Sequence, residues 1–357
     1  MIDSKELLKQ FEPKERNVVT ADPQMRSARF APCGKVLVGG GFDGRVRRWN
    51  FADDALPELS ALAGHHGWVD AVAFRAADEL MFTADSWGQL CCWSNYAAEQ
   101  PTVKWKLDQA HDGWIRDVAI SADGKLLASC GTDCVARVWS ADDGKSQREL
   151  ANYGRDIMRV CFAADGTLIT GDDRGIVKHW QADGTLIREF NASILYQLSR
   201  LQDVGGIHAM TLSPAGDLLA VGGISSGNGA TVTGIPTVLI FKLATGEQLH
   251  KLTLGANNDC FVADMRFHAE GFLSLVTYGT PGQGQLLYVL PEEGKPFFTL
   301  KKMANCQSIT WHPTGTQFAV VATNGGSNGN GRALDKNGNY PGNKSPIHVF
   351  AIPARTA

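Results

Sequence analysis

Two short segments of the chain carry histidine and tryptophan side chains in the same order and at the same spacing. One contains AGHHGWVDAVAF, and the other, 46 residues further on, contains QAHDGWIRDVAI. His65 therefore matches His111, and Trp68 matches Trp114. Histidine can act as a general base, a metal ligand or a hydrogen-bond donor, whereas an exposed tryptophan favours protein binding. The residues around the two segments decide which of these roles applies.

The other titratable residues do not form the patterns that catalysis or metal binding needs. The sequence has no paired carboxylates at glycosidase spacing, no histidine cluster and no nucleophile beside a base. Its eight cysteines lack the second ligand pair of a zinc site. Asp335, Asn337 and Asn339 have the spacing of a calcium loop, but Tyr340 replaces the turn glycine and no glutamate closes the loop. We therefore expect no catalytic residues, no metal and no cofactor.

Composition and charge restrict the partners. The chain has 357 residues, 44% of them hydrophobic, and a formal net charge of -3. A charge so close to neutral argues against nucleic acid or an anionic membrane surface as the main partner. No segment approaches the ~18 apolar residues of a membrane span, and the charged N-terminal segment lacks the apolar centre of a secretory signal. We therefore expect a cytoplasmic protein that binds neither nucleic acid nor membrane.

A tight-turn signal that begins with an apolar residue recurs along the chain, at intervals of 42 to 55 residues. The seven segments are FAPCG, FRAAD, ISADG, FAADG, LSPAG, FHAEG and WHPTG. The closing glycine supplies the positive φ of a short hairpin turn, and Asp78 is expected to take that role in the second segment. Two short β-rich runs follow each turn, the second ending in an aromatic or large aliphatic residue, as in RVRRW and VARVW. Short strands with a period of about 40–50 residues are typical of a β-propeller.

The third unit, AHDGWIRDVAISADGKLLASCGTDCVARVWS, resembles a WD repeat from end to end. In that family four residues, here called the tetrad, hydrogen-bond the strands of a unit to the loop before it. The matching residues are His111, Ser129, Asp133 and Trp139 in the third unit, His65, Thr83 and Trp93 in the second, Asp43 and Trp49 in the first, and Thr170 and Trp180 in the fourth. Trp87 stands where the second unit should have its aspartate, and Tyr153 or a neighbour replaces the histidine of the fourth. The last three units keep only the turn-and-strand pattern, so the chain resembles a divergent, bacterial-type WD-repeat protein.

The resemblance implies an all-β fold, a seven-bladed β-propeller of four-stranded antiparallel blades that forms a single domain over residues 1–357. The seventh unit ends after its third strand, SPIHVFAIPA. In WD-repeat propellers an N-terminal strand commonly completes the last blade, and residues 1–22 contain the run RNVVT. We therefore predict that Val18 and Val19 pair beside PIHVF and close the ring, which removes an exposed sheet edge. A short helix is expected around SKELLKQF.

The resemblance further implies a non-enzymatic scaffold that binds a protein or peptide partner. In this family the loops between the second and third strands of each blade (the b–c loops) share one face, the top, with the loops that lead into the first strand. The residues expected to bind there, on and around blades two and three, are Trp68, Trp87, Trp114, Asp70, Arg116 and Arg155. Exposed tryptophans on a rigid rim are typical binding hot spots. Alternatively, Trp68 and Trp114 only pack over the bracing histidines, an explanation that fits Trp87 less well.

Two of the b–c loops are expanded, at residues 224–236 in blade five and 324–344 in blade seven. Long loops in compact domains are usually functional or disordered. We consider two roles for them, a second, adaptable contact surface or a tolerated insertion. They also underlie the rival hypothesis, a propeller enzyme (hydrolase or lyase) whose site the long loops build. Inner-strand charges such as Asp117 and Arg159 are interpreted as ionic neutralisation of the channel.

Overall fold

The computed structural model describes residues 3–150, 154–199, 201–228, 233–279, 282–323 and 343–353. The chain divides into two compact units, Arg26–Ser193 on the one hand and Met1–Met25 with Ile194–Ala357 on the other. We call them the four-blade unit and the three-blade unit, because they contain four and three of the four-stranded antiparallel sheets. The fold is all-β, as predicted, and is a β-propeller of seven four-stranded blades.

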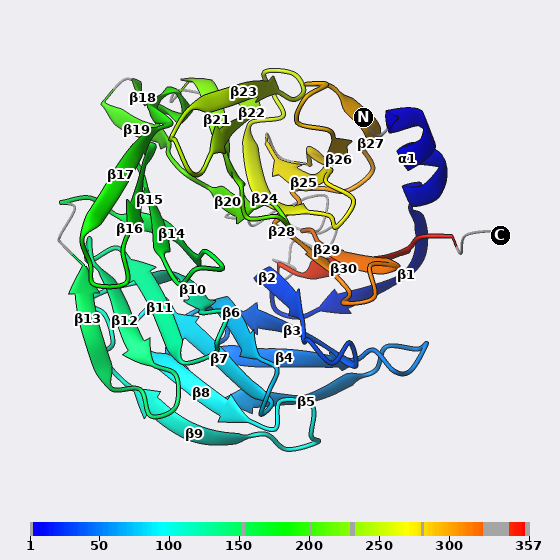
Figure 1. Ribbon diagram of the computed structural model, residues 1–357. Helices are drawn as coiled ribbons and strands as arrows, with labels where there is room; N and C mark the ends of the chain where they lie inside the picture. The colour runs from blue at the N-terminus through cyan, green and yellow to red at the C-terminus, as the bar shows by residue number, and fades with distance from the viewer. Residues whose placement is uncertain are drawn as a thin grey trace. The chain divides into compact units, whose positions relative to one another are not determined.

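Each blade of the four-blade unit is a meander of four strands, called a to d in chain order (Figure 1, blue to green). Blade one contains β2 (Met25–Phe30), β3 (Val36–Gly41), β4 (Arg45–Asn50) and β5 (Glu58–Ala63), and blade two contains β6 (Val69–Arg75), β7 (Leu80–Asp85), β8 (Leu90–Ser94) and β9 (Thr102–Leu107). Blade three contains β10 (Ile115–Ile120), β11 (Leu126–Gly131), β12 (Ala136–Ser140) and β13 (Ser146–Leu150), and blade four contains β14 (Ile157–Phe162), β15 (Leu168–Asp172), β16 (Ile176–Trp180) and β17 (Leu186–Asn191).

The three-blade unit contains the remaining blades. Blade five consists of β20 (Ala209–Leu212), β21 (Leu218–Asn228), β22 (Thr233–Lys242) and β23 (Gln248–Thr253), and blade six of β24 (Phe261–Phe267), β25 (Leu273–Tyr278), β26 (Gly284–Val289) and β27 (Pro296–Leu300). Blade seven consists of β28 (Ser308–Trp311), β29 (Gln317–Val321), β30 (Ser345–Ala351) and β1 (Lys14–Ala21). Outside the blades lie helix α1 (Ser4–Phe11), the 3-10 helix η1 (Ser193–Leu195) and the hairpin of β18 (Tyr196–Ser199) and β19 (Gln202–Gly205).

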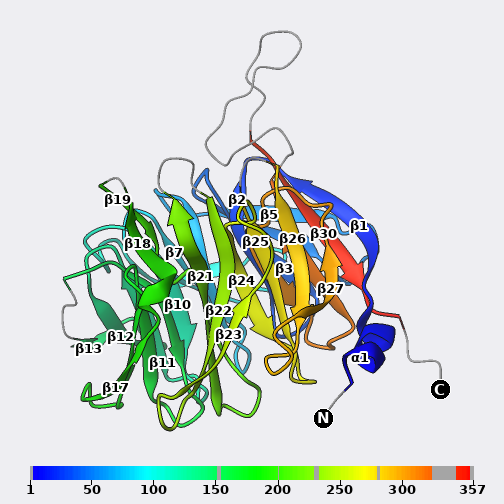
Figure 2. The ribbon, with the colours of Figure 1, turned by 90° about the horizontal axis from the view of Figure 1, so that it is seen from above.

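The N-terminal strand completes blade seven, as predicted. β1 runs antiparallel to β30, with Val18 opposite His348 and Val19 opposite Ile347. Figure 2 shows the two strands side by side. The helix expected at SKELLKQF is also present, as α1. Because β1 pairs with β30, the outer edge of β30 is covered by a strand from the other end of the sequence.

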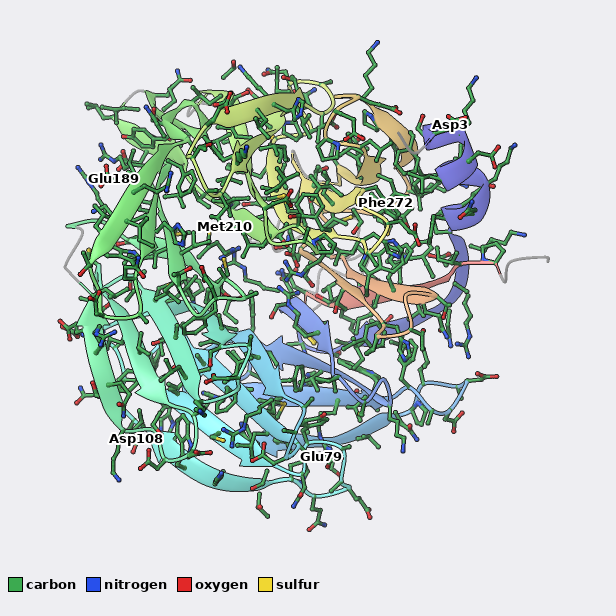
Figure 3. The ribbon with its side chains drawn as sticks, viewed as in Figure 1. Asp3, Glu79, Asp108, Glu189, Met210 and Phe272 are labelled. Atoms are coloured by element: carbon green, nitrogen blue, oxygen red, sulfur yellow. The ribbon has the colours of Figure 1, made fainter. Side chains whose placement is uncertain are left out.

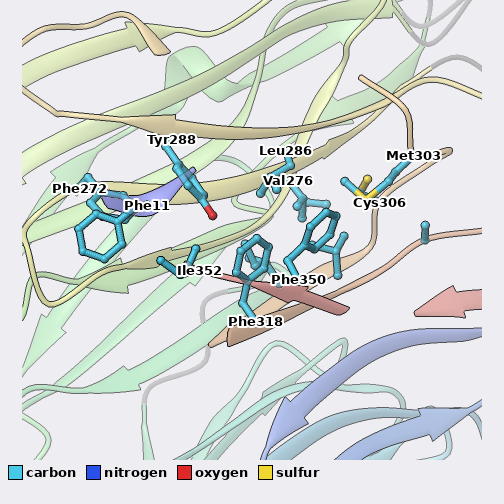
Figure 4. Close-up of a cluster of buried hydrophobic side chains, with 14 of the residues drawn as sticks. Phe11, Phe272, Val276, Leu286, Tyr288, Met303, Cys306, Phe318, Phe350 and Ile352 are labelled. Carbon is cyan, nitrogen blue, oxygen red and sulfur yellow. The ribbon is translucent and has the colours of Figure 1, made fainter. Parts of the chain in front are cut away.

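Helix α1 docks on the three-blade unit through its apolar side. Leu7 and Phe11 are buried in a cluster formed by blades six and seven (Figure 4). The Phe11 ring meets the His268 ring edge to face, with 4.6 Å between the centroids, and lies 5.3 Å from the Phe272 ring. The residues before β1 are therefore part of the core of this unit.

The apolar cores of the four-blade unit lie between neighbouring blades. Trp93, Trp139 and Trp180, at the ends of the c strands of blades two to four, are all buried. Each belongs to a cluster that it shares with the blade before it. Burying a large aromatic side chain contributes about 2–3 kcal/mol, so each c-strand tryptophan holds two consecutive blades together.

The first turn of blade two differs from the prediction. In the other blades the closing glycine has positive φ, for example 70° at Gly34 and 72° at Gly124. In blade two the positive φ, 53°, falls on Glu79 (labelled in Figure 3) and not on Asp78. The Arg75 guanidinium group donates to both carboxylate oxygens of Asp78, at 2.8 and 2.7 Å. The role predicted for Asp78 is therefore wrong, because the residue with positive φ comes one position later and Asp78 pairs with Arg75.

The expanded b–c connection of blade five is mostly strand, which corrects the prediction of a loop at residues 224–236. Ile224 pairs with Pro236 and Ser225 with Ile235, so the β21–β22 ladder continues far beyond the usual blade length. Its glycines and serines favoured a loop because these residues are common in turns. In the other expanded connection, residues 324–342 lie outside the described residues, and these include Asp335, Asn337, Asn339 and Tyr340. Tyr153 also lies outside the described residues.

The hairpin β18–β19 was not predicted. Its Val204 is buried with Ile224 of the extended ladder and Phe261 of blade six. Leu201, in the turn, has φ 65° and is 95% exposed. The long interval between the fourth and fifth turn signals was the sequence feature that could have revealed an insertion here.

Candidate functional site

The tetrad residues of blade three form a chain of hydrogen bonds. His111 Nε2 lies 2.7 Å from Ser129 Oγ, to which Trp139 Nε1 also donates at 2.8 Å. His111 Nδ1 lies 2.9 Å from Asp133 Oδ1. Burial lowers the pKa of His111, although the bond to Asp133 opposes that effect. Since both ring nitrogens are engaged within the blade, His111 has a bracing role and no free nitrogen for a metal or a substrate.

Blade two forms the same network with a different aspartate. His65 Nε2 lies 2.7 Å from Thr83 Oγ1, which also accepts from Trp93 Nε1 at 2.8 Å. The carboxylate that holds His65 Nδ1, at 3.1 Å, comes from Asp85. The expectation that Trp87 leaves this blade without its acid is therefore wrong. Asp85, two residues earlier, reaches the same histidine.

Asp85 and Asp172 occupy the same position in blades two and four but differ in their partners. Both are buried. Asp85 accepts four backbone amides as well as His65, and these bonds lower its pKa although burial alone would raise it. Asp172 accepts backbone amides from the residues that follow it, and burial raises its pKa although these bonds oppose the effect; no histidine bonds to it among the described residues.

The position of Trp87 carries half of an ion pair in other blades. In blade one Asp43 pairs with Arg47, four residues later, at 2.8 Å, and blade three has the equivalent pair. In blade two, Cys91 stands at the position that corresponds to Arg47, so this blade lacks both the aspartate and the arginine of the pair. Trp87 therefore replaces an aspartate without leaving an unpaired cation. This Asp-x₃-Arg pattern is readable in the sequence.

Paired backbone bonds hold Trp68 and Trp114 in equivalent positions. The Trp68 amide donates to Ser86 Oγ, and the Trp68 carbonyl accepts from the Ser86 amide, both at 2.9 Å. Trp114 and Thr132 form the same two bonds at 3.0 Å. Each loop leading into strand a is thus bonded twice to the b–c loop of its own blade, which fixes the backbone from which the indole ring projects.

Trp68 lies between two other aromatic rings. It stacks on Phe42 of blade one, with 4.5 Å between centroids and 9° between planes. It meets Trp114 edge to face at 5.7 Å, and 43% of its surface stays exposed. We call Phe42, Trp68 and Trp114 the aromatic row. Sequence reasoning missed Phe42, whose signal is an apolar residue inside the glycine-rich turn GGGFDG.

Trp87 is the most exposed aromatic side chain of this region, at 67%. It lies against Gly67, where an added Cβ would come 2.8 Å from Trp87 Cδ1, and its ring is 6.3 Å from the His66 ring. Its amide donates to Asp85 Oδ1 at 2.9 Å. The structure therefore brings Trp68 and Trp114 into direct contact and sets Trp87 beside the loop that carries Trp68.

Of the three charged neighbours expected from the sequence, Arg116 contacts the aromatic row and Asp70 is connected to it only through Arg26. The guanidinium carbon of Arg116 lies 3.7 Å from the centre of the Trp114 ring. Asp70 pairs with Arg26 at 3.7 Å, and Arg26 lies 5.6 Å from the same ring. Arg155 is exposed and makes no ring contact within the described part of the chain. Arg26, which the sequence analysis did not single out, lies near the Trp114 ring, whereas Arg155 does not contact it.

The inner-strand carboxylates bond to neighbouring blades. Asp117 Oδ2 accepts from the Val160 amide of blade four at 3.2 Å. In the three-blade unit, Asp264 Oδ2 accepts from the Ile309 amide of blade seven at 3.2 Å, and Asp264 also pairs with Arg266 at 2.8 Å. These side chains cross-link consecutive a strands, a role beyond the charge neutralisation that we expected.

No group of three or more histidine, cysteine, aspartate or glutamate side chains is arranged to hold a metal in the described residues. A small crevice between blades three and four is lined mainly by apolar side chains, namely Leu126, Val138, Leu150, Phe162 and Leu168, together with Arg148 and Gln181. Among the helices described, none is long and apolar enough to cross a membrane.

The family model described as WD domain, G-beta repeat matches residues 15–50 and 103–140. Each matched segment begins in a strand d, β1 or β9, and ends at strand c of the next blade. The sequence repeat is therefore one strand out of step with the blade. This offset is why the N-terminal strand completes blade seven.

Several WD-repeat proteins are similar to parts of the chain. Human apoptotic protease-activating factor 1 is 29% identical over 140 residues, which is 38% of this chain and 11% of that protein. The small ribosomal subunit protein RACK1y of Oryza sativa subsp. japonica is 29% identical over 128 residues, 35% of this chain and 37% of that protein. The guanine nucleotide-binding protein subunit beta-like protein of Encephalitozoon cuniculi is 25% identical over 210 residues, 57% of this chain and 58% of that protein.

The matched region spans less than two thirds of each of these relatives. The fold, the repeat matches and the relatives nevertheless agree on one class. The chain is similar to WD-repeat β-propellers, and two of its segments match the WD-repeat family model. These relatives are eukaryotic proteins, and the expected likeness to bacterial WD-repeat proteins stays a prediction.

Proposed function

We propose that this protein is a non-enzymatic scaffold that binds a protein or peptide partner through Trp87 and the aromatic row. The observation that carries the proposal is the exposure of Trp87, 67%, at a position where blades one and three hold an aspartate in an ion pair. WD-repeat propellers generally bind proteins. One relative is named a small ribosomal subunit protein, which is the kind of assembly role that such a scaffold would have.

The energetics of the exposed tryptophans support this proposal. An indole buried at the centre of an interface typically contributes ~2 kcal/mol or more. The bonds between Trp68 and Ser86 fix the backbone of Trp68, and Phe42 and Trp114 hold its ring, so little conformational freedom is lost when a partner binds. A rigid, exposed aromatic surface therefore binds at a low entropic cost.

The charged residues would form the polar rim of this surface. Asp70 and Arg116 lie beside the row, and Arg155 is exposed at the lead-in to blade four. A polar rim excludes water from the apolar centre and selects among partners. No observation on the described residues favours a hydrolase or lyase site built by the long loops, and we do not propose one. The cytoplasmic location stays a prediction from composition.

A comparison of captured partners tests the proposal. The full chain and the variants Trp68→Ala and Trp87→Ala are used as bait in extract of the native cells. The control is Leu186→Ala, because Leu186 is 43% exposed, as Trp68 is, but lies on strand d of blade four. We expect partners bound by the wild type and the control to be reduced at least about tenfold with either tryptophan variant. Full retention by both variants, with unchanged circular dichroism, would contradict the proposal.

A further inference from the structure

Arg116 is a half-buried cation for which the described part of the chain provides no hydrogen-bond acceptor. It is the second residue of β10, and its guanidinium carbon lies over the Trp114 ring, 3.7 Å from the ring centre. Its Nε is shielded from solvent and makes no hydrogen bond, and its terminal nitrogens have no partner among the described residues. Burial lowers the pKa of Arg116, which reflects the unfavourable environment of its charge.

Other arginines of the four-blade unit show what Arg116 lacks. Arg48, which is fully buried, donates to four backbone carbonyls. Arg75 binds two carboxylates, and Arg159 donates to the carbonyl of the residue before it. A partly desolvated charge without such partners is unfavourable. The Nε of Arg48 is unpaired like that of Arg116, so the difference lies in the terminal nitrogens, which have acceptors in Arg48, Arg75 and Arg159 and none among the described residues in Arg116.

The charges around Arg116 sum to an excess of one positive charge. The second residues of the a strands in blades one to four are Arg26, Asp70, Arg116 and Met158. Arg26 and Asp70 pair with each other, so Arg116 is the uncompensated member of this series. The charged groups that act on it are Arg26, Asp70, Asp156 and Arg159, two of each sign.

Hydrogen-bond acceptors are also scarce at this point of the surface. Trp114 Nε1 is shielded from solvent and has no acceptor in the described part of the chain. Of the two carboxylates that act on Arg116, that of Asp70 is engaged with Arg26, and that of Asp156 makes no hydrogen bond to Arg116. A ligand that brought an acceptor to Arg116 would therefore supply what the protein itself does not.

We infer that the partner presents an aspartate or glutamate carboxylate to Arg116, next to an apolar side chain that contacts Phe42 and Trp68. This inference rests on the proposed function and specifies its partner as an acidic peptide segment. A carboxylate accepts two parallel bonds from one guanidinium group. A phosphate group is disfavoured, because its second charge would meet Asp70 and Asp156 while only one cation is uncompensated.

Selection from a phage-displayed library of random short peptides tests this inference. The full chain, Arg116→Gln and the control Arg148→Gln are panned in parallel. Arg148 is an arginine on β13, the outer strand of the same blade. We expect peptides selected by the wild type and the control to be enriched in aspartate and glutamate, and those selected by Arg116→Gln to lose that enrichment.

Affinities of one selected peptide complete the test. Changing its acidic residue to the amide should weaken binding to the wild type at least about tenfold and leave binding to Arg116→Gln nearly unchanged.

If peptides bind without acidic enrichment, or bind wild type and Arg116→Gln equally, the inference fails while the proposed function stands. If no peptide binds the full chain, the inference fails, and the capture experiment alone decides the proposed function. Tighter binding of a phosphoserine version would overturn the choice of a carboxylate. The amide peptide gives a result even if Arg116→Gln folds poorly.

Discussion

At the scale of single residues, Asp85 and Asp172 can be compared directly, because blades two and four repeat the same local structure. They occupy the same position, and both are buried and accept backbone amides. Only Asp85 faces a histidine, and the pKa of Asp85 is lowered whereas that of Asp172 is raised. The charged form of Asp85 therefore stabilises the folded state, while the charged form of Asp172 destabilises it.

The amide variants should separate the two residues. We expect Asp85→Asn to lower the free energy of unfolding at neutral pH by about 2–3 kcal/mol, because it removes a charged hydrogen-bond acceptor from His65. Asp172→Asn should change it by less than about 0.5 kcal/mol, since its oxygen still accepts the backbone amides. Urea denaturation measures both values, and equal losses would refute this account of the network.

His268 makes the stability of the three-blade unit sensitive to acid. It is buried against Phe11, Phe272 and Trp311, and burial lowers its pKa although Glu270 opposes the effect. The unfolded state then takes up a proton more readily than the folded state, so stability is lost as the pH falls below the unfolded value of about 6.5.

Replacing this ring tests the assignment. His268→Phe keeps the aromatic contacts and removes the titrating group, so its unfolding midpoint should fall less between pH 7.5 and pH 5 than that of the wild type (roughly the range in which histidine titrates). The control His250→Phe, on strand d of blade five, should keep the wild-type dependence. A wild-type dependence in the His268 variant would show that other groups are responsible.

At the scale of elements, hydrogen bonds between blades complement the apolar layers. Arg48, on strand c of blade one, donates to carbonyls of the segment that joins the last two strands of blade two, among them Ala98 at 2.7 Å and Glu99 at 2.8 Å. Asp117 bonds from one a strand to the next in the same way. Consecutive blades are therefore held at the outer side and at the inner strand.

Loss of the hydrogen bonds of Arg48 should lower the free energy of unfolding strongly. Arg48→Met fills much of the same volume but leaves buried carbonyls without donors, and we expect the free energy of unfolding to fall by about 3 kcal/mol or more. Arg45→Met, at an exposed position of the same strand, should change it by less than about 0.5 kcal/mol. Chemical denaturation compares them, and a small loss for Arg48→Met would mean that water replaces its bonds.

At the scale of the whole molecule, the sequence predicts the blades better than the site. Seven turn signals and the c-strand tryptophans predict the blades, because each reflects local chemistry repeated at one spacing. The acid of blade two was misassigned because Asp85 reaches His65 from two positions earlier, which spacing alone does not reveal. Phe42 was missed because its contact with Trp68 joins two blades. Contacts between repeats depend on packing, and a pattern within one repeat does not contain them.

The N-terminal segment gives a prediction at this scale. A chain lacking residues 1–22 loses β1, which pairs with β30, and α1, which buries Leu7 and Phe11. We expect its thermal midpoint to fall by roughly 10 °C or more, because several kcal/mol of contacts disappear. Calorimetry measures the change. A midpoint equal to that of the full chain would show that β1 contributes little to blade seven.

The central claim is that Trp68 and Trp87 anchor a protein partner. Calorimetric titration tests it most directly, with a partner that the wild type and Leu186→Ala capture equally well. We expect Trp68→Ala and Trp87→Ala each to raise the Kd at least about thirtyfold, which corresponds to ~2 kcal/mol, while Leu186→Ala leaves it unchanged. An unchanged Kd for both folded tryptophan variants would contradict the claim and place the binding surface elsewhere on the molecule.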